Sequence, residues 1–257
     1  KLEKVDRFIE GMKDASAAPI FNECRQWLLD NLDRFDNLTK EDVESISPEI
    51  CNCATLSTLH GCPPQEIERI ASYLLTEKKV HTFIKCNPTL LGYEYARKLM
   101  DDMGYDYVAF GDFHFRDDLQ YTDAVPMLQR LQKLADEKGL EFGVKITNTF
   151  PVDVKQNELP SEEMYMSGKS LYALSMSVAQ KLAKDFDGKL RISYSGGADY
   201  FNITKIVDAG IWPVTMATTM LKPGGYERLE QIGQLFKAKE AAAFAGVSAE
   251  KVEAMVE

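Results

Sequence analysis

One stretch decides both the fold and the candidate site: Arg191-Ile192-Ser193-Tyr194-Ser195-Gly196-Gly197-Ala198-Asp199. It predicts a short strand, then a glycine turn, and then a helix that starts at Asp199. Because glycine has no Cβ, two adjacent glycines let the backbone approach a ligand closely. The N-terminus of the following helix favours an anion at the same place, so the stretch predicts a phosphate site at Gly196 and Gly197.

A second stretch strengthens this prediction. Residues 212–219 read as an apolar strand that ends in the hydroxyls of Thr218 and Thr219. The carboxyl ends of neighbouring parallel strands lie at one edge of a sheet, so the Gly-Gly and Thr-Thr ends are expected to form a single phosphate pocket. A Gly-Gly turn alone is typical of ordinary turns, and the pair of strand ends is the more specific feature.

Outward from these stretches, six strand-like segments alternate with amphipathic helices. The expected strands are 54–59, 82–86, 105–110, 142–147, 190–195 and 213–218, and the expected helices between and after them are 64–74, 92–103, 122–138, 169–185, 200–209 and 225–237. This alternation predicts a parallel sheet covered by helices. Periodicity alone allows an open doubly wound sheet or a barrel, and the late phosphate-type strand ends favour a TIM-type (β/α) barrel.

The expected barrel is incomplete, because a full one has eight strands. The chain begins at Lys1 without a methionine, so the two missing strands are expected upstream, on the N-terminal side. Helices at 2–14, 19–34 and 40–46 are expected to pack on the barrel as a unit covering residues 1–47. The barrel region is placed at 48–240, and 241–257 is predicted to be a helix, capped by Ser248, that leads to a following domain. Residues 149–168 are predicted to be a long loop over the site.

Composition narrows the classes of function. The chain has 257 residues with 30 Lys and Arg against 40 Asp and Glu, a net charge of −10, which argues against nucleic acid and membrane surfaces as partners. No apolar run approaches the roughly 20 residues of a membrane helix. Five cysteines favour reduced thiols and a cytoplasmic location. Paired metal-ligand spacings are missing, and so are Walker and Rossmann glycine motifs, so no metal site is predicted.

Polar residues at the strand ends are the candidate site. Lys85 and Lys145 each interrupt an apolar strand, and such a lysine either stabilises an anion or extends its amine to solvent. Cys62 precedes Pro63-Pro64 at a helix start, where the helix is expected to lower the thiol pKa; the alternative is a small buried thiol. Asn87 and Asn148 either bond the edge of a heteroaromatic ring or cap their loops.

A family resemblance emerges from several motifs together. LSTLHGCPP (56–64), IKCNPTLLG (84–92), VKITNT (144–149), EMYMSG (163–168), SYSGGAD (193–199) and MATTMLKPGG (216–225) closely resemble the bacterial selenate reductase subunit family. Members of that family are multidomain flavin and iron–sulfur oxidoreductases. The chain resembles their barrel region, which is similar to the FMN domains of dihydropyrimidine and dihydroorotate dehydrogenases.

The resemblance implies roles for particular residues. FMN is expected in this region, with FAD, iron–sulfur clusters and NAD(P)H confined to the rest of a longer protein. The cofactor-binding residues implied by motif and strand end are Ser57, Asn87, Asn148, Ser167, Gly168, Ser195, Gly196, Gly197, Thr218 and Thr219. Lys145 or Lys85 would be the lysine beside the flavin. Cys62 would be the acid/base on the substrate side, although the usual Asn-x-Ser-Cys-Pro of those enzymes is replaced here.

The leading hypothesis is therefore a flavin-dependent oxidoreductase that passes hydride or electrons between flavin and a small heterocyclic or oxyanion substrate. Its expected partners are this small molecule and other domains or subunits of a redox complex. Two alternatives stay open. One is a class I aldolase-type barrel in which Lys145 forms a Schiff base, and the other is a cofactor-free scaffold barrel.

Overall fold

A parallel sheet of four strands forms the centre of the molecule. The computed structural model describes residues 2–58, 61–238 and 243–256. The strands are β1 (Cys53–Ser57), β2 (His81–Cys86), β3 (Phe142–Ile146) and β6 (Arg191–Tyr194), in the spatial order β1-β2-β3-β6. Leu59, expected at the end of the first strand, and His60 beyond it lie outside the described residues. The other three strands confirm the predictions at 82–86, 142–147 and 190–195.

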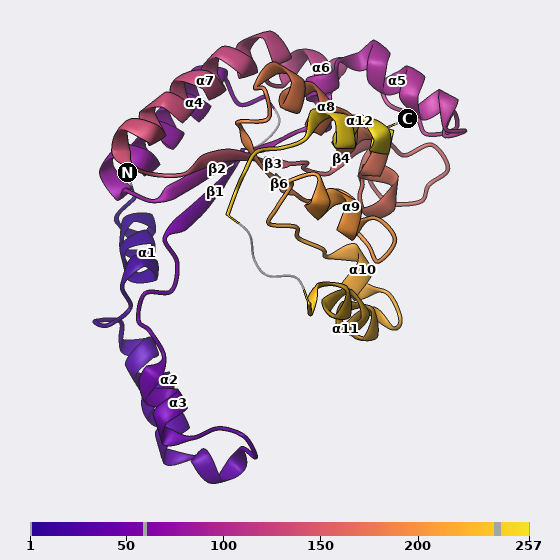
Figure 1. Cartoon of the computed structure of the whole chain (residues 1–257). Helices are drawn as coiled ribbons and strands as arrows, with labels where there is room; N and C mark the ends of the chain where they lie inside the picture. The colour runs from indigo at the N-terminus through magenta and orange to yellow at the C-terminus, as the bar shows by residue number, and fades with distance from the viewer. Residues whose placement is uncertain (1, 59–60, 239–242, 257) are drawn as a thin grey trace.

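Helices cover one face of this sheet. Figure 1 shows α4 (Pro64–Tyr73) and α7 (Tyr121–Lys138) running along it, with α8 (Tyr172–Asp185) beside them. The strand residues facing these helices are fully or almost fully buried, namely Ile84, Cys86, Val144, Ile146, Ile192 and Tyr194. Each large apolar side chain buried in this way stabilises the fold by about 1.5–3 kcal/mol. Burial in this core accounts for the spacing of apolar residues in the sequence, with a period of 2 in the strands and 3.6 in the helices.

The opposite face carries the polar residues. Lys85 of β2 pairs in register with Ser57 on one side and with Lys145 on the other, and Lys145 pairs with Ser193. Registered neighbours in a sheet point to the same face. A polar row therefore crosses the sheet near the carboxyl ends of its strands.

The predicted strand at 105–110 is wrong. The segment is an irregular turn, and two of its carbonyl groups accept hydrogen bonds from an arginine side chain. The Arg97 guanidinium, on α5 (Tyr93–Asp102), donates to the carbonyl of Val108 at 2.6 Å and to that of Tyr105 at 3.1 Å. The ring of Phe110 also lies 4.4 Å from this guanidinium. The apolar residues that predicted a strand here therefore belong to a turn that contacts Arg97.

The predicted strand at 213–218 is reduced to a single bridge. Val214 pairs with Tyr194 in parallel, so the segment does lie beside β6. Pro213 has no N–H to donate and accepts from the Tyr194 N–H at 2.9 Å. Thr218 already begins the short helix α10 (Thr218–Leu221), which ends the extended conformation.

The predicted loop at 149–168 contains structure of its own. β4 (Phe150–Asp153) and β5 (Glu163–Met166) form an antiparallel pair in which Phe150 is opposite Met166. Short helical segments fill other connections: η2 (Leu74–Lys78), η3 (Pro88–Leu91), α6 (Phe113–Asp117) and η4 (Gly168–Leu171). The loop from β5 therefore reaches the site on a hairpin.

The helix after the Gly-Gly turn starts later than expected. α9 runs over Ile203–Asp208, and Asp199 lies in the preceding turn, where its N–H donates to Asn202 Oδ1 at 2.8 Å. The chain continues through α11 (Gly225–Phe236) and α12 (Ala249–Val256). The predicted cap of the last helix is confirmed, because the Lys251 N–H donates to Ser248 Oγ at 3.3 Å. Among the described residues, no helix is both long and apolar enough to cross a bilayer.

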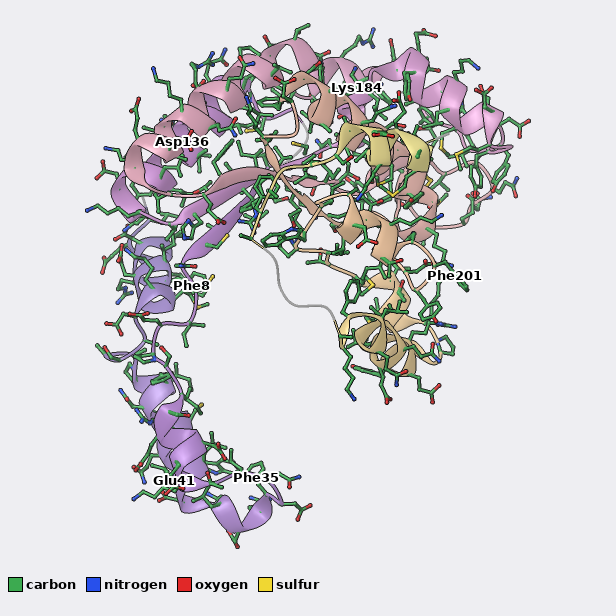
Figure 2. All side chains as sticks on the ribbon, in the orientation of Figure 1. Phe8, Phe35, Glu41, Asp136, Lys184 and Phe201 are labelled. Carbon is green, nitrogen blue, oxygen red and sulfur yellow. The ribbon has the colours of Figure 1, made fainter. Side chains whose placement is uncertain are left out.

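The N-terminal helices form an arm. α1 (Glu3–Lys13) is held to the domain by Lys78, whose ammonium pairs with Asp6 and, at 2.8 Å, with Glu10. α2 (Pro19–Asp30), η1 (Leu32–Arg34) and α3 (Lys40–Ser45) extend away from the sheet, with Phe35 and Glu41 at the far end (Figures 1 and 2). The domain boundary at residue 47 stays a prediction, and the one at residue 240 lies outside the described residues.

Candidate functional site

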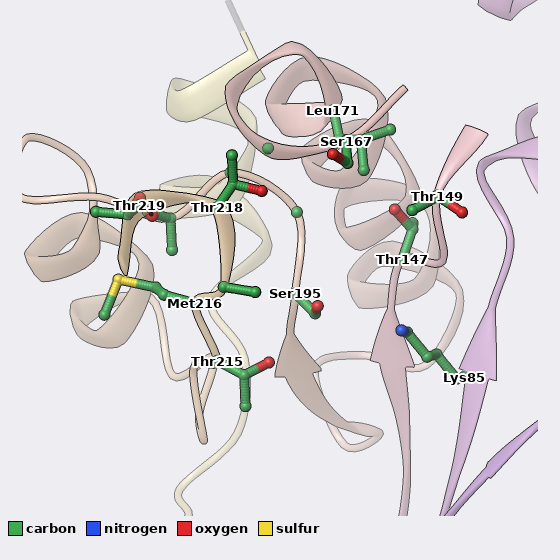
Figure 3. A pocket seen from close by; sticks show the side chains of 15 residues that line it. Lys85, Thr147, Thr149, Ser167, Leu171, Ser195, Thr215, Met216, Thr218 and Thr219 are labelled. Carbon is green, nitrogen blue, oxygen red and sulfur yellow. Dashed lines mark hydrogen bonds between the residues drawn. The ribbon is translucent and has the colours of Figure 1, made fainter. Parts of the chain in front are cut away.

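A pocket of about 210 Å³ lies at the carboxyl ends of the strands. Figure 3 shows its two ends, with Thr218 and Thr219 on one side and Lys85 on the other. Eight of the residues singled out from the sequence line it together: Lys85, Ser167, Gly168, Ser195, Gly196, Gly197, Thr218 and Thr219. The other lining residues were not predicted from the sequence to bind a ligand: Thr147, Thr149, Leu171, Ala198, Thr215, Met216 and Ala217.

The Gly-Gly turn forms one wall of this pocket. Gly197 has φ +85°, a region that residues with a Cβ rarely adopt. The carbonyls of the turn are occupied, because Tyr194 Oη donates to the Gly196 carbonyl at 2.6 Å and Asn202 Nδ2 to the Gly197 carbonyl at 3.0 Å. Within the described residues, no protein acceptor bonds the N–H groups of Gly196, Gly197 and Ala198. Three successive donors at a pocket wall suit an anion.

The hairpin loop and the Thr-Thr end complete that side of the pocket. Gly168, with φ +72°, lies so close to Thr218 that a Cβ would meet its methyl carbon at 3.0 Å. Thr219 Oγ1 donates to the Ala198 carbonyl at 3.2 Å, which joins α10 to the glycine turn. The predicted combination of the Gly-Gly and Thr-Thr ends with the Ser167-Gly168 loop is therefore one continuous surface.

The two lysines differ in position. Lys85 lines the pocket, whereas Lys145, its neighbour in register, is not among the lining residues. Burial lowers the pKa of Lys85. Burial and then the adjacent Lys85 charge lower the pKa of Lys145. No carboxylate among the described residues forms an ion pair with either lysine. An anionic ligand would supply the missing counter-charge.

Asn87 and Asn148 lie in a chain of hydrogen bonds at the ends of β1, β2 and β3. Ser57 Oγ donates to Asn148 Oδ1 at 3.2 Å, and Asn148 Nδ2 donates to Asn87 Oδ1 at 2.7 Å. Asn87 Nδ2 donates in turn to Asp118 at 3.0 Å. Asp118 is buried, with 4% of its surface exposed. Asp118 was not predicted as a site residue from the sequence. It follows Asp117 in a segment without helix or strand periodicity.

The expected activation of Cys62 by a helix N-terminus is wrong. The thiol lies just before α4, but burial, with a smaller contribution from Glu66, raises its pKa. Cys62 lines a separate small cavity of about 20 Å³, together with Lys85, Asn87 and Asp118. Cys62 therefore lies near the candidate site, and its thiol is protonated at neutral pH.

Metal ligands are not gathered in the part of the chain that the structure describes, where no group of three or more His, Cys, Asp or Glu side chains is placed to hold an ion. The donors present are backbone N–H groups, hydroxyls, amides and ammonium groups. This set suits an organic anion better than a transition metal.

The chain resembles known proteins in sequence. A family described as the N-terminal TIM-barrel domain of the oxidoreductase YgfK matches residues 1–257. The "Putative oxidoreductase YgfK" of Escherichia coli K12 is 46% identical over 240 residues, and so is that of Escherichia coli O157:H7. The match covers 89% of this chain and 23% of either relative, so the chain spans about a quarter of their length.

Solved structures show a weaker likeness. The DHODH of Eimeria tenella in complex with ferulenol is 20% identical, covers 72% of this chain and 45% of its own, and gives a TM-score of 0.37. Its ligand-free form is 15% identical, with coverages of 74% and 58% and a TM-score of 0.34. Such scores carry no argument about the site. The family match does establish the fold: this chain belongs to the family of N-terminal TIM-barrel domains of the oxidoreductase YgfK.

Proposed function

We propose that the pocket binds FMN and that the chain is the FMN-linked oxidoreductase domain of a larger, selenate reductase-like redox enzyme. One observation carries the proposal. The N–H groups of Gly196, Gly197 and Ala198, which have no acceptor in the described protein, lie in the same pocket as the unpaired ammonium of Lys85. A phosphate at one end and an electron-rich ring edge at the other would satisfy both sets of donors.

The residues present fit the two ends of such a ligand. The glycine turn, Thr218 and Ser167 would hold the phosphate, through amide and hydroxyl donors. Lys85 would neutralise negative charge at the ring edge, and Asn148 is next to the lining residues Thr147 and Thr149. Bound flavin supplies hydride and electron transfer, and the protein's task is to orient it and tune its charge. The proposed substrate is a small heterocycle or an oxyanion.

A phosphate-dependent affinity tests this proposal. FMN and riboflavin share the ring and differ in the phosphate, so titration of each, followed by flavin fluorescence, isolates the glycine turn. Charge-assisted hydrogen bonds contribute about 1.5–3 kcal/mol each, so FMN is expected to bind at least tenfold more tightly than riboflavin. Equal affinities, or no binding of either, would argue against a phosphate site here.

A second candidate function is a Schiff-base aldolase. The lowered pKa of Lys145 favours it, because an amine that loses its proton readily is a better nucleophile. Borohydride reduction in the presence of a carbonyl substrate would trap the adduct on Lys145, and mass spectrometry would locate it. The absence of Lys145 from the pocket lining favours the flavin proposal over this one.

The remaining proposals concern the larger protein. We propose that FAD, iron–sulfur clusters and NAD(P)H belong to its other domains, which act as redox partners of this one in the cytoplasm. A cofactor-free scaffold is the third candidate, and it requires Lys85 and Lys145 to be dispensable for activity. Loss of activity in Lys85→Met and Lys145→Met variants of the complete enzyme would exclude it.

A further inference from the structure

Asp118 is the end point of a hydrogen-bond chain with a single possible direction. An ionised carboxylate only accepts hydrogen bonds, so Asn87 must turn its amide nitrogen toward Asp118. Its oxygen then accepts from Asn148, whose own oxygen accepts from Ser57. The direction of each amide is therefore fixed by its neighbour, beginning at a carboxylate that is 4% exposed.

The same carboxylate also holds the loop before Cys62. The Gly61 N–H donates to Asp118 Oδ1 at 2.9 Å, and Thr89 Oγ1 donates to Oδ2 at 2.7 Å. Asp118 thus joins the loop after β1, the end of β2 and, through Asn87, the end of β3. All three segments belong to the Lys85 end of the site.

From this geometry we infer that Asp118 is a positioning residue that makes the Lys85 end of the site a surface of hydrogen-bond donors. The amide oxygens of Asn87 and Asn148 already accept hydrogen bonds from other members of this hydrogen-bond chain. To a ligand this end offers the Lys85 ammonium, which lines the pocket, and, as part of the same proposal, the second N–H of Asn148, whose chain neighbours Thr147 and Thr149 line it. It therefore recognises an acceptor-rich or anionic edge, such as paired carbonyl oxygens or a deprotonated ring nitrogen, and it excludes a donor edge.

This inference rests on the proposed function for the identity of the ligand, because a reduced flavin carries more negative charge on its carbonyl edge than an oxidised one. Donors fixed by Asp118 then bind the reduced form more tightly. The effect is transmitted through Asn87 and Asn148 and requires no contact between Asp118 and the ligand.

The test compares Asp118→Asn with Asp117→Asn, an exposed neighbour that undergoes the same change of charge. Asparagine-selective ¹⁵N labelling reports the side-chain amides directly in the free protein, with Asn87→Ser and Asn148→Ser identifying the two signals. In Asp118→Asn both signals are expected to shift and to exchange faster, whereas Asp117→Asn leaves them unchanged. Unchanged signals in Asp118→Asn would overturn the positioning role.

The second readout is the midpoint potential of bound FMN. Loss of fixed donors should weaken binding of reduced relative to oxidised flavin about tenfold, which lowers a two-electron potential by about 30 mV. A potential equal to that of Asp117→Asn would overturn the donor-edge assignment even where the amide signals shift. If the wild-type protein binds no FMN, the proposed function fails, and the amide signals still decide the role of Asp118.

Ser57→Ala guards against misfolding of the Asp118 variant, because it removes only the exposed far end of the chain. The direction of the chain predicts that the Asn148 signal shifts and the Asn87 signal does not. A shift of both, or of Asn87 alone, would contradict the direction deduced here.

Discussion

The backbone of Gly197 lies against the carbonyl oxygen of Gly168, so closely that a Cβ on Gly197 would meet that oxygen at 2.6 Å. The two glycines belong to different loops, one after β6 and one after the β4–β5 hairpin. Their contact joins these loops into the wall of the pocket that carries the unpaired N–H groups. Both have positive φ, so neither position tolerates a side chain without strain.

Gly197→Ala should therefore reduce FMN affinity at least tenfold. The left-handed backbone alone costs about 1–2 kcal/mol with a Cβ, and the clash with Gly168 separates the two loops. Fluorescence titration measures the affinity. Gly111→Ala is the matched control, because nothing lies within 4 Å of its added Cβ. Equal losses in both variants would show that the contact is irrelevant to binding.

Gly196 makes a second close approach, to Ser175 on α8, where an added Cβ would overlap the serine hydroxyl. Gly196→Ala should destabilise the protein by about 1–3 kcal/mol, as overpacking does. Ser175→Gly removes the obstructing atoms, so the double variant should be more stable than the sum of the two single changes. Denaturant melts of all four proteins measure this coupling, and strict additivity would contradict the contact.

The paired lysines predict an unusual pH dependence. Burial lowers the pKa of both, and the Lys85 charge lowers that of Lys145 further. The unfolded chain then binds more protons between the folded and unfolded pKa values, so stability rises with pH across that window and the lysines cost stability below it. The double variant Lys85→Met with Lys145→Met should melt roughly 2–4 °C higher than wild type at pH 7.

That difference in melting temperature should shrink toward pH 10.5, where the two half-buried lysines, with their lowered pKa values, are largely deprotonated in wild type too. Lys133→Met, at an exposed site on α7, controls for the added methionine. A double variant that melts below wild type at pH 7 would show that groups of the protein already stabilise the two ammonium groups, so that no bound anion is needed as a counter-charge.

Cys62 should behave as an unactivated thiol. Burial and Glu66 raise its pKa, so the thiolate is scarce at neutral pH, and the thiolate is the reactive form. With Cys24, Cys51 and Cys53 changed to serine, alkylation by iodoacetamide should be slower than that of free cysteine at pH 7.5. The rate should rise about tenfold per pH unit toward pH 9. Rapid alkylation at pH 7 would show instead that the helix N-terminus activates the Cys62 thiol, as the sequence suggested.

The sequence predicted those features that short periodic segments or local backbone chemistry determine. The strands of the parallel sheet, the Ser248 cap and the joining of Gly196 and Gly197 with Thr218 are of this kind. Each depends on residues close together in the chain, or on the rule that parallel strand ends share one edge.

What the sequence missed depends on long-range partners. Arg97 takes the carbonyls of Tyr105 and Val108, so an alternating segment becomes a turn. Pro213 leaves its segment a single bridge to β6. Asp118 becomes important only because Asn87, 31 residues away, turns toward it. No local pattern marks such a partner. The lowered thiol pKa expected at Cys62 is wrong because burial and Glu66 raise that pKa.

The flavin content of the natural full-length protein is the decisive measurement for an FMN site in this domain. The protein would be purified without added cofactor, and the flavin released by acid would be identified by chromatography, for wild type and for Gly197→Glu. FMN binding at the glycine turn predicts FMN in the wild type and its selective loss in the variant, with any FAD held elsewhere retained. FMN absent from the folded wild type, or retained by Gly197→Glu, would contradict it.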